Sequence, residues 1–419
     1  MGLVNPTIAI VVSLCFLVVL LYKRFNLGIV LNVTATLLAV LALDWDRIPG
    51  VVYATIDPMT LEGRLTISVV LATFAVMLLS QLYKETGMIT KLSESMGNII
   101  NNPKTVLCML PAVIGLLPVA GGALMSAPLV DTEAEKLKLK PDRKAYINLW
   151  FRHTIFPVYP ISQPLIVAAA MMGVAVPILI LRQIPVVIVM VATGYIIGFW
   201  KVSQTKEQRE TGAAKGESSD IKEFLTTFSP ILMTIAVAVT LDIVSGDLGK
   251  QGFDVLIATI IGLTTLVLVS RSNLQVFAKP FKSWGIYGIT FAAYGAFLLR
   301  GVMTNAGISQ IFQSFVSNGN IDIVVLLTVI PAVLGFLTGS PQGGIAIGAS
   351  ILAGILTFSP KIAALVYISA YLGYVIAPTH LCFTFTAQYF KCSLSRLYRY
   401  IIPSFAITFA MALIVYFFL

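Results

Sequence analysis

The sequence predicts an all-α, polytopic membrane protein built from two inverted repeats. Hydrophobic residues make up 58% of the 419 positions and charged residues only 11%, whereas a soluble protein carries about 25% charged residues. The apolar residues form runs long enough to cross a bilayer, which takes about 20 residues per helix. Short motifs also recur at a nearly constant spacing between the two halves of the chain.

The apolar segments follow the same order in both halves. The first repeat, residues 1–200, has runs at about 5–22, 27–43, 64–83 and 176–199, a re-entrant hairpin at about 104–130 and a broken helix at about 146–172. A polar segment, 201–223, is the expected cytoplasmic linker. The second repeat, 224–419, has runs at about 224–243, 253–271, 284–303 and 396–419, a hairpin at about 321–357 and a broken helix at about 361–389.

Internal similarity supports the repeat. The segment 111–117 (PAVIGLL) matches 331–337 (PAVLGFL) at five of seven positions with an offset of 220. The same offset pairs Gly87 with Gly307, and an offset of 218 pairs Pro160 with Pro378. A nearly constant offset across consecutive elements is typical of an internal duplication.

Charge placement sets the expected orientation. The net charge is +9, but most basic residues lie in short loops, as the positive-inside rule predicts, rather than in a pattern suited to nucleic acid. We expect each half to have five membrane spans and one re-entrant hairpin. With this topology Lys23, Arg24 and most other basic residues lie on the cytoplasmic side. An odd number of spans inverts the second half, and both termini are then expected outside the cell membrane.

The helical pattern is broken by Gly or Pro at four places at membrane depth, namely 118–122, 156–164, 338–344 and 377–380. These breaks mark the expected binding site. Irregular backbone there must be buried in protein or line a watery cavity, and paired breaks in corresponding positions of two repeats indicate a transporter site. Half-helix N-termini suit an anion. The expected substrate-binding residues are Val119, Ala120, Gly121, Gly122, Ser126, Arg152, Ser162, Gln163, Ser340, Gln342, Gly343, Gly344, Thr379 and His380.

A coupling ion is expected beside the substrate. No Asp or Glu falls in the middle of a span, so Na⁺ would bind hydroxyls and backbone carbonyls, and proton coupling would use a histidine or the substrate's own carboxylate. Na⁺ is the only metal ion expected, and no cofactor is expected. The expected coupling-ion residues are Pro118, Gly121, Ser126, Pro160, Thr338, Gly339, Ser340, Pro378 and Thr379.

Intramembrane polar side chains sharpen these expectations, since such residues are costly and usually functional. Arg152 has two interpretations, contact with an anion or snorkelling to the interface. His380 lies in the second-half break, a position that favours a role at the site. His153 is interpreted as a packing or interfacial residue. The four cysteines show no zinc-type spacing, and those within apolar runs are interpreted as small packing residues.

The pattern resembles the ion transporter superfamily, which includes citrate, gluconate, C4-dicarboxylate, divalent-anion and arsenite permeases. The resemblance rests on the tips 118–122 (PVAGG) and 338–344 (TGSPQGG) and on 377–380 (APTH). It points to a prokaryotic branch without the paired Ser-Asn-Thr signature of the divalent-anion symporters. It implies homodimers and elevator-type alternating access.

The predicted function is therefore secondary symport of a small organic or inorganic anion, most readily a carboxylate, with Na⁺ or H⁺. Its partners would be the anion, the lipid bilayer and a second copy, and no nucleic acid. A channel or exchanger on the same fold stays open. An intramembrane enzyme is remote, because no nucleophile–base pair and no Walker A, GxSxG or HExxH motif occurs. A membrane scaffold would not need four symmetric helix breaks.

Overall fold

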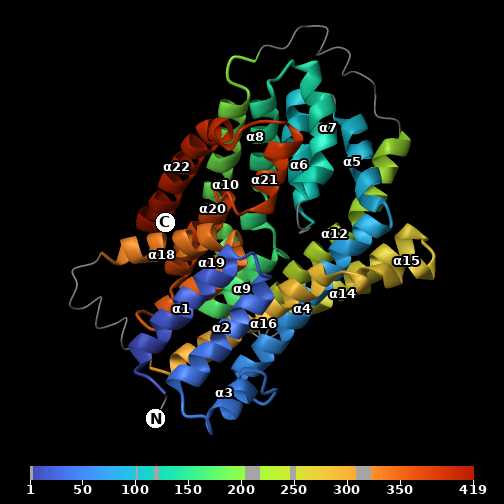
Figure 1. Cartoon of the computed structure of the whole chain (residues 1–419). Helices are drawn as coiled ribbons and strands as arrows, with labels where there is room; N and C mark the ends of the chain where they lie inside the picture. The colour runs from blue at the N-terminus through green and yellow to red at the C-terminus, as the bar shows by residue number, and fades with distance from the viewer. Residues whose placement is uncertain (1–2, 101, 118–121, 203–217, 246–251, 308–321) are drawn as a thin grey trace.

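A computed structural model describes residues 3–100, 102–117, 122–202, 218–245, 252–307 and 322–419. Within these ranges the chain is all-helical, which confirms the predicted fold class (Figure 1). Seven helical segments are long and apolar enough to cross a membrane, namely Leu61–Glu85, Pro141–Met172, Val176–Gly198, Ser218–Val244, Phe253–Ser270, Trp284–Asn305 and Leu394–Phe418. Shorter apolar helices supplement them.

The uninterrupted helices include one at each expected apolar run. In the first half they are α1 (Pro6–Tyr22), α2 (Leu27–Ala42), α3 (Ile48–Thr55), α4 (Leu61–Glu85), α5 (Met88–Ile99) and α10 (Val176–Gly198). In the second half they are α12 (Ser218–Val244), α14 (Phe253–Ser270), the short α15 (Leu274–Ala278) and η2 (Lys279–Lys282), α16 (Trp284–Asn305) and α22 (Leu394–Phe418). The short helices α3, α5, α15 and η2 were not expected, since amphipathic or very short segments leave little signal in a scan for apolar runs.

The two interrupted runs form helix pairs. The first comprises α6 (Pro103–Gly115) and α7 (Ala123–Lys136), and the second comprises α18 (Ile323–Thr338) and α19 (Pro341–Leu352). The two helices of each pair pack against each other. Gly339 ends α18 in the left-handed region with φ 58°, a conformation that glycine adopts without steric cost. Pro341 then begins α19, where its missing N–H is no loss.

The two expected broken helices are also present. The first runs through α8 (Pro141–Arg152), η1 (Phe156–Val158) and α9 (Gln163–Met172), and the second through α20 (Pro360–Val375) and α21 (Leu381–Tyr389). Proline sits at each break or just beyond it, and proline cannot continue a helix hydrogen-bond ladder. The breaks therefore follow directly from local sequence.

Contacts between elements recur in pairs across the two halves. α6 packs on α8 as α18 packs on α20, and α9 packs on α19 as α21 packs on α7. A Cβ atom at Gly115 would overlap the carbonyl oxygen of Arg152, and one at Gly335 would overlap that of Ala370. These glycines let each hairpin approach the broken helix of its own half. The opposite membrane orientation of the halves, and the proposed domain boundaries, stay predictions.

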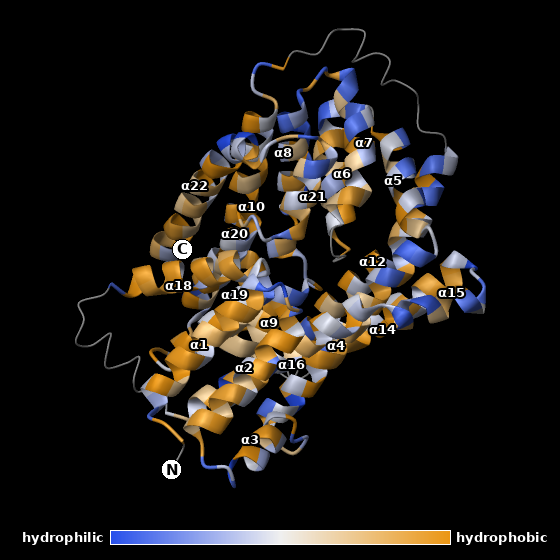
Figure 2. Cartoon of the chain, in the orientation of Figure 1, coloured by the Kyte–Doolittle hydropathy of each residue, from blue (hydrophilic) through white to orange (hydrophobic). Residues whose placement is uncertain are grey.

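The long helices consist mostly of apolar residues (Figure 2), and many large apolar side chains are exposed, as lipid contact requires. Leu181 and Ile188 of α10 are 66% and 62% exposed, and Leu268 of α14 is 72% exposed. Polar and charged residues gather at helix ends, while several polar side chains are buried where the broken helices meet. That buried polar region contains the candidate site.

Candidate functional site

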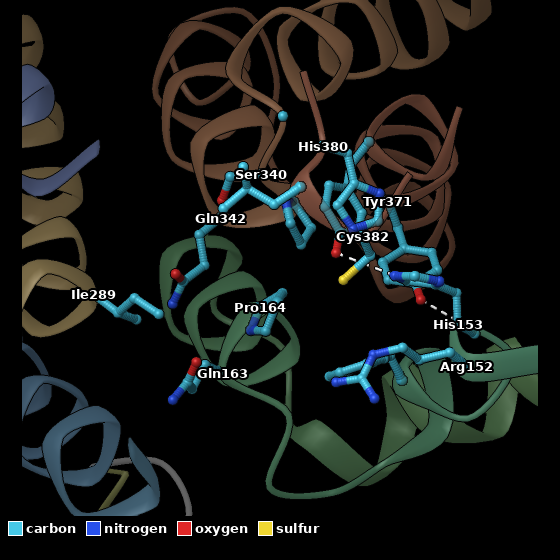
Figure 3. A pocket seen from close by; sticks show the side chains of 15 residues that line it. Arg152, His153, Gln163, Pro164, Ile289, Ser340, Gln342, Tyr371, His380 and Cys382 are labelled. Carbon is cyan, nitrogen blue, oxygen red and sulfur yellow. Dashed lines mark hydrogen bonds between the residues drawn. The ribbon is translucent and has the colours of Figure 1, made fainter. Parts of the chain in front are cut away.

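A cavity of about 200 Å³ lies where the two broken helices and the second hairpin meet (Figure 3). Its wall is formed by the break between α8 and α9, the C-terminal part of α20, the N-terminus of α19, the start of α21 and one residue of α16. The cavity is lined by Arg152, His153, Phe156, Gln163, Pro164, Ile289, Gly339, Ser340, Pro341, Gln342, Tyr371, Tyr374, His380, Leu381 and Cys382. None of these described lining residues is acidic.

Arg152, the last residue of α8, brings a positive charge to this wall. Its side chain is only 2% exposed, and its Nη2 donates to the carbonyl oxygen of Leu117 at 3.2 Å. Its Nη1 has no hydrogen-bond partner among the described residues. Buried charges in proteins are normally paired, so this guanidinium has charge and hydrogen-bonding capacity that no described side chain uses.

Other polar groups on the wall also have unused hydrogen-bonding capacity. The Nε2 atoms of Gln163 and Gln342 have no hydrogen-bond partner among the described residues, although these side chains are 3% and 7% exposed. Both ring nitrogens of His380, which is 3% exposed, are likewise without a partner there. A buried donor without a partner costs free energy, so a ligand that accepts hydrogen bonds would stabilise this wall.

Three helix N-termini open toward the same region. Ser162 precedes α9, Ser340 precedes α19 and His380 precedes α21, and none of these three side chains caps its helix. The first N–H groups of a helix have no partner within the helix and carry partial positive charge. Together with Arg152 they form a donor-rich environment that suits an anion.

The two histidines of the chain meet at the cavity. His153 Nδ1 lies 2.6 Å from the Leu149 carbonyl oxygen, and its Nε2 lies 3.2 Å from the hydroxyl of Tyr374. The ring centroids of His153 and His380 are 4.8 Å apart in an edge-to-face arrangement. The Tyr371 hydroxyl donates to the His153 carbonyl oxygen at 2.6 Å. His153, expected mainly to pack, both packs and lines the cavity.

The structure brings together part of the expected site. Arg152, Gln163, Ser340, Gln342 and His380 line the cavity, as does Gly339 from the coupling-ion set. Expected residues that are described but do not line it are Gly122, Ser126, Pro160, Ser162, Thr338, Gly343, Gly344, Pro378 and Thr379. Pro118, Val119, Ala120 and Gly121 lie outside the described residues.

Several of these hydroxyls bind protein groups instead. The Ser126 hydroxyl lies 2.6 Å from Asn148 Oδ1, and Asn148 Nδ2 donates to the Ala123 carbonyl oxygen at 3.0 Å. Thr338 Oγ1 donates to the Leu334 carbonyl oxygen at 2.8 Å. Thr379 Oγ1 donates to the Phe336 carbonyl oxygen at 3.0 Å, joining the second hairpin to the second break. Their expected roles in ion or substrate binding stay predictions.

Sequence reasoning missed several lining residues. Phe156, Tyr371 and Tyr374 are aromatic residues in apolar surroundings, a pattern that otherwise indicates core packing. Cys382 was interpreted as a packing residue, yet its Sγ and ring nitrogens of His153 and His380 lie within 4.8 Å of one another. These three residues come from different halves of the chain, so no metal-ligand spacing in the sequence could reveal the cluster.

Comparison with known proteins gives matches among solved structures and a match to one family. The structure is similar to a crystal structure of the YdaH transporter of Alcanivorax borkumensis, which is described as having an unusual topology. The TM-score is 0.62 at 13% sequence identity, covering 90% of this chain and 89% of that chain. The fold is therefore that of a transporter, and no curated protein matches the chain. Residues 7–419 match the DUF401 family, so the chain belongs to this family of proteins of unknown function.

Proposed function

We propose that this protein is a secondary active transporter that carries a small anion, coupled to Na⁺ or H⁺, through the cavity beside Arg152. The observation that carries the proposal is a buried guanidinium that faces a cavity with no acidic side chain among its described lining residues. Hydrogen bonds to a charged group contribute about 1.5–3 kcal/mol each. An anion at Arg152 would gain such bonds and compensate the buried charge.

The volume and charge of the cavity support a small anionic substrate. Its volume is about 200 Å³. Among the described residues of its wall, Arg152 is the only Lys or Arg. A carboxylate matches the planar donor fork of a guanidinium, which binds two acceptor oxygens at once. We therefore place a small carboxylate first among the anions and an inorganic oxyanion second.

Two routes for coupling fit the wall. Na⁺ could bind hydroxyl and carbonyl oxygens near the second hairpin tip, where Thr338, Ser340 and Thr379 lie close to one another. A proton could instead travel on the substrate's own carboxylate or bind His380 on the cavity wall. Either ion would offset part of the anion's charge during transport.

The wider proposal follows from the resemblance to the ion transporter superfamily. It comprises a homodimer in the cell membrane, elevator-type alternating access and both termini outside. The paired contacts of hairpins and broken helices support an internal repeat. Reporter fusions at the C-terminus that are active only outside or only inside the cell test the orientation, and mass measurement in detergent tests the dimer.

Thermal stability of the purified protein, recorded with a panel of anions in Na⁺ or K⁺ at two pH values, tests the function. A ligand that binds only the folded state at a hundredfold excess over its Kd stabilises it by about 2.7 kcal/mol. A shift that requires Na⁺ supports Na⁺ symport, and one stronger at low pH supports H⁺ symport. No shift with any carboxylate or oxyanion would contradict the anion assignment.

A further inference from the structure

A cluster of nitrogen and sulfur ligands lies at one side of the cavity. His153 follows α8 in the first half, while His380 and Cys382 lie at the start of α21 in the second. Their ligand atoms lie within 4.8 Å of one another, and all three side chains are buried. Figure 3 shows the sulfur of Cys382 beside the ring of His380, on the same side of the cavity as His153. We propose that this cluster binds one thiophilic transition-metal ion, Zn²⁺ or Cu⁺.

His153 is held as a metal ligand would be. Its Nδ1 lies 2.6 Å from the Leu149 carbonyl oxygen, which can only accept a hydrogen bond, so Nδ1 carries the proton. The lone pair of the ring is then on Nε2, to which the Tyr374 hydroxyl donates at 3.2 Å. A metal ion bound at Nε2 would replace this hydrogen bond. Metal-binding histidines almost always donate their other N–H to a carbonyl or carboxylate in this way.

His380 and Cys382 supply the two further ligands. Both ring nitrogens of His380 are without a hydrogen-bond partner among the described residues, at 3% exposure. Cys382 is a free thiol with 6% exposure. Coordination of a metal by one imidazole nitrogen would satisfy a buried group that otherwise costs free energy. The thiol binds as a thiolate, and its proton is released to solvent.

The ligand set selects the class of metal. Two imidazoles and one thiolate suit Zn²⁺ and Cu⁺, whereas Na⁺, Mg²⁺ and Ca²⁺ prefer oxygen. Zinc bonds of about 2.0–2.3 Å in tetrahedral geometry put ligand atoms about 3.3–3.6 Å apart. The three atoms lie within 4.8 Å of one another, so changes in side-chain torsions would have to shorten their separations by up to about 1.5 Å. Three protein ligands leave a fourth position open toward the cavity.

The charge of Arg152 is compatible with this site. A Cu⁺–thiolate pair is neutral, and a Zn²⁺–thiolate pair carries a net charge of about +1. Arg152 lines the same cavity, so a bound anion would offset the positive charge beside Zn²⁺. The metal and the anion would therefore favour each other's binding, and coupling between binding sites is reciprocal.

Cobalt spectroscopy of the full chain tests the site. The purified, reduced protein is treated with a chelator, exchanged into chelator-free buffer and titrated with Co²⁺, and Zn²⁺ is then added as a competitor. We expect one Co²⁺ per chain, a thiolate-to-cobalt charge-transfer band, and displacement by Zn²⁺. Cys382→Ser should remove the charge-transfer band, and His380→Gln should weaken Zn²⁺ binding at least about tenfold, as the loss of a group that supports a metal site does.

Cys392→Ser is the matched control, because Cys392 is a free thiol that does not line the cavity. It should keep both the band and the stoichiometry. A charge-transfer band of full strength in Cys382→Ser, or its loss in Cys392→Ser, would overturn the assignment. His153→Gln provides a second test if Cys382→Ser does not fold, and unchanged Zn²⁺ affinity in a folded His153→Gln protein would also overturn it.

Discussion

The substitution Arg152→Gln separates the cost of a buried charge from its use in binding. In the protein without substrate, the Arg152 guanidinium is 2% exposed and, within the described part of the chain, makes one hydrogen bond, to the Leu117 carbonyl oxygen. A buried charge without an ionic partner costs free energy, and the neutral amide of Gln removes that cost while it can still donate a hydrogen bond. We therefore expect the substrate-free variant to unfold at the wild-type temperature or higher.

With the anion present, we expect the variant to gain less stability against unfolding than the wild type does. Loss of a charge-assisted interaction of about 2 kcal/mol raises the Kd about 30-fold. At an anion concentration of one hundred times the wild-type Kd, the stabilisation would fall from about 2.7 to about 0.9 kcal/mol. Thermal unfolding with and without the anion measures both quantities on the same samples.

Arg300→Gln is the matched control. Arg300 Nη1 also donates to a backbone carbonyl, that of Met171 at 2.8 Å, but Arg300 lines a different cavity. Its substitution should leave the anion-dependent shift at the wild-type value. The reasoning is refuted if Arg152→Gln keeps the full shift, or if Arg300→Gln loses the shift as completely as Arg152→Gln does.

Three further predictions concern packing and coupling. Gly335→Ala should destabilise the protein by about 1–3 kcal/mol, because the added methyl overlaps the backbone of α20; Gly97→Ala, which meets open space, should not destabilise it in the same unfolding assay. Asn148→Leu removes buried hydrogen bonds that join α7, α8 and α21 and should cost about 1–3 kcal/mol by thermal unfolding; wild-type stability would contradict a structural role. If protons couple through His380, an inward H⁺ gradient should drive anion uptake by protein freed of metal with a chelator, and His380→Gln should abolish that dependence without affecting Na⁺-driven uptake. An unchanged dependence on the H⁺ gradient would leave Na⁺ or substrate protonation as the coupling route.

Much of the architecture could be predicted because lipid imposes simple rules on sequence. Long apolar runs predict the long helices, and Pro and Gly at 118–122, 156–164, 338–344 and 377–380 mark interruptions that recur in both halves. The structure has helix pairs or breaks at the described parts of these positions. The membrane orientation of the halves depends on charge placement alone and stays a prediction.

The site was harder to predict, since its wall combines residues distant in the chain. Arg152, Gln163, Gln342 and His380 were found because polar side chains near helix breaks are rare and costly. Tyr371, Tyr374 and Cys382 were missed because aromatic and thiol side chains in apolar runs look the same whether they pack or line a cavity. Ser126 was expected at the site but does not line the cavity; its hydroxyl bonds to Asn148, a detail of side-chain geometry, and its role in binding stays a prediction.

Anion uptake into proteoliposomes tests the central claim most directly. Vesicles with the purified protein would be given the labelled anion that produces the largest thermal shift, under an inward Na⁺ gradient, an inward H⁺ gradient or neither. The account predicts saturable uptake above equilibrium that depends on one of the two gradients, is lost in Arg152→Gln and is retained in Arg300→Gln. Flux that never saturates and ignores both gradients would contradict symport and favour a channel, and gradient-driven uptake by Arg152→Gln at the wild-type rate would contradict the site.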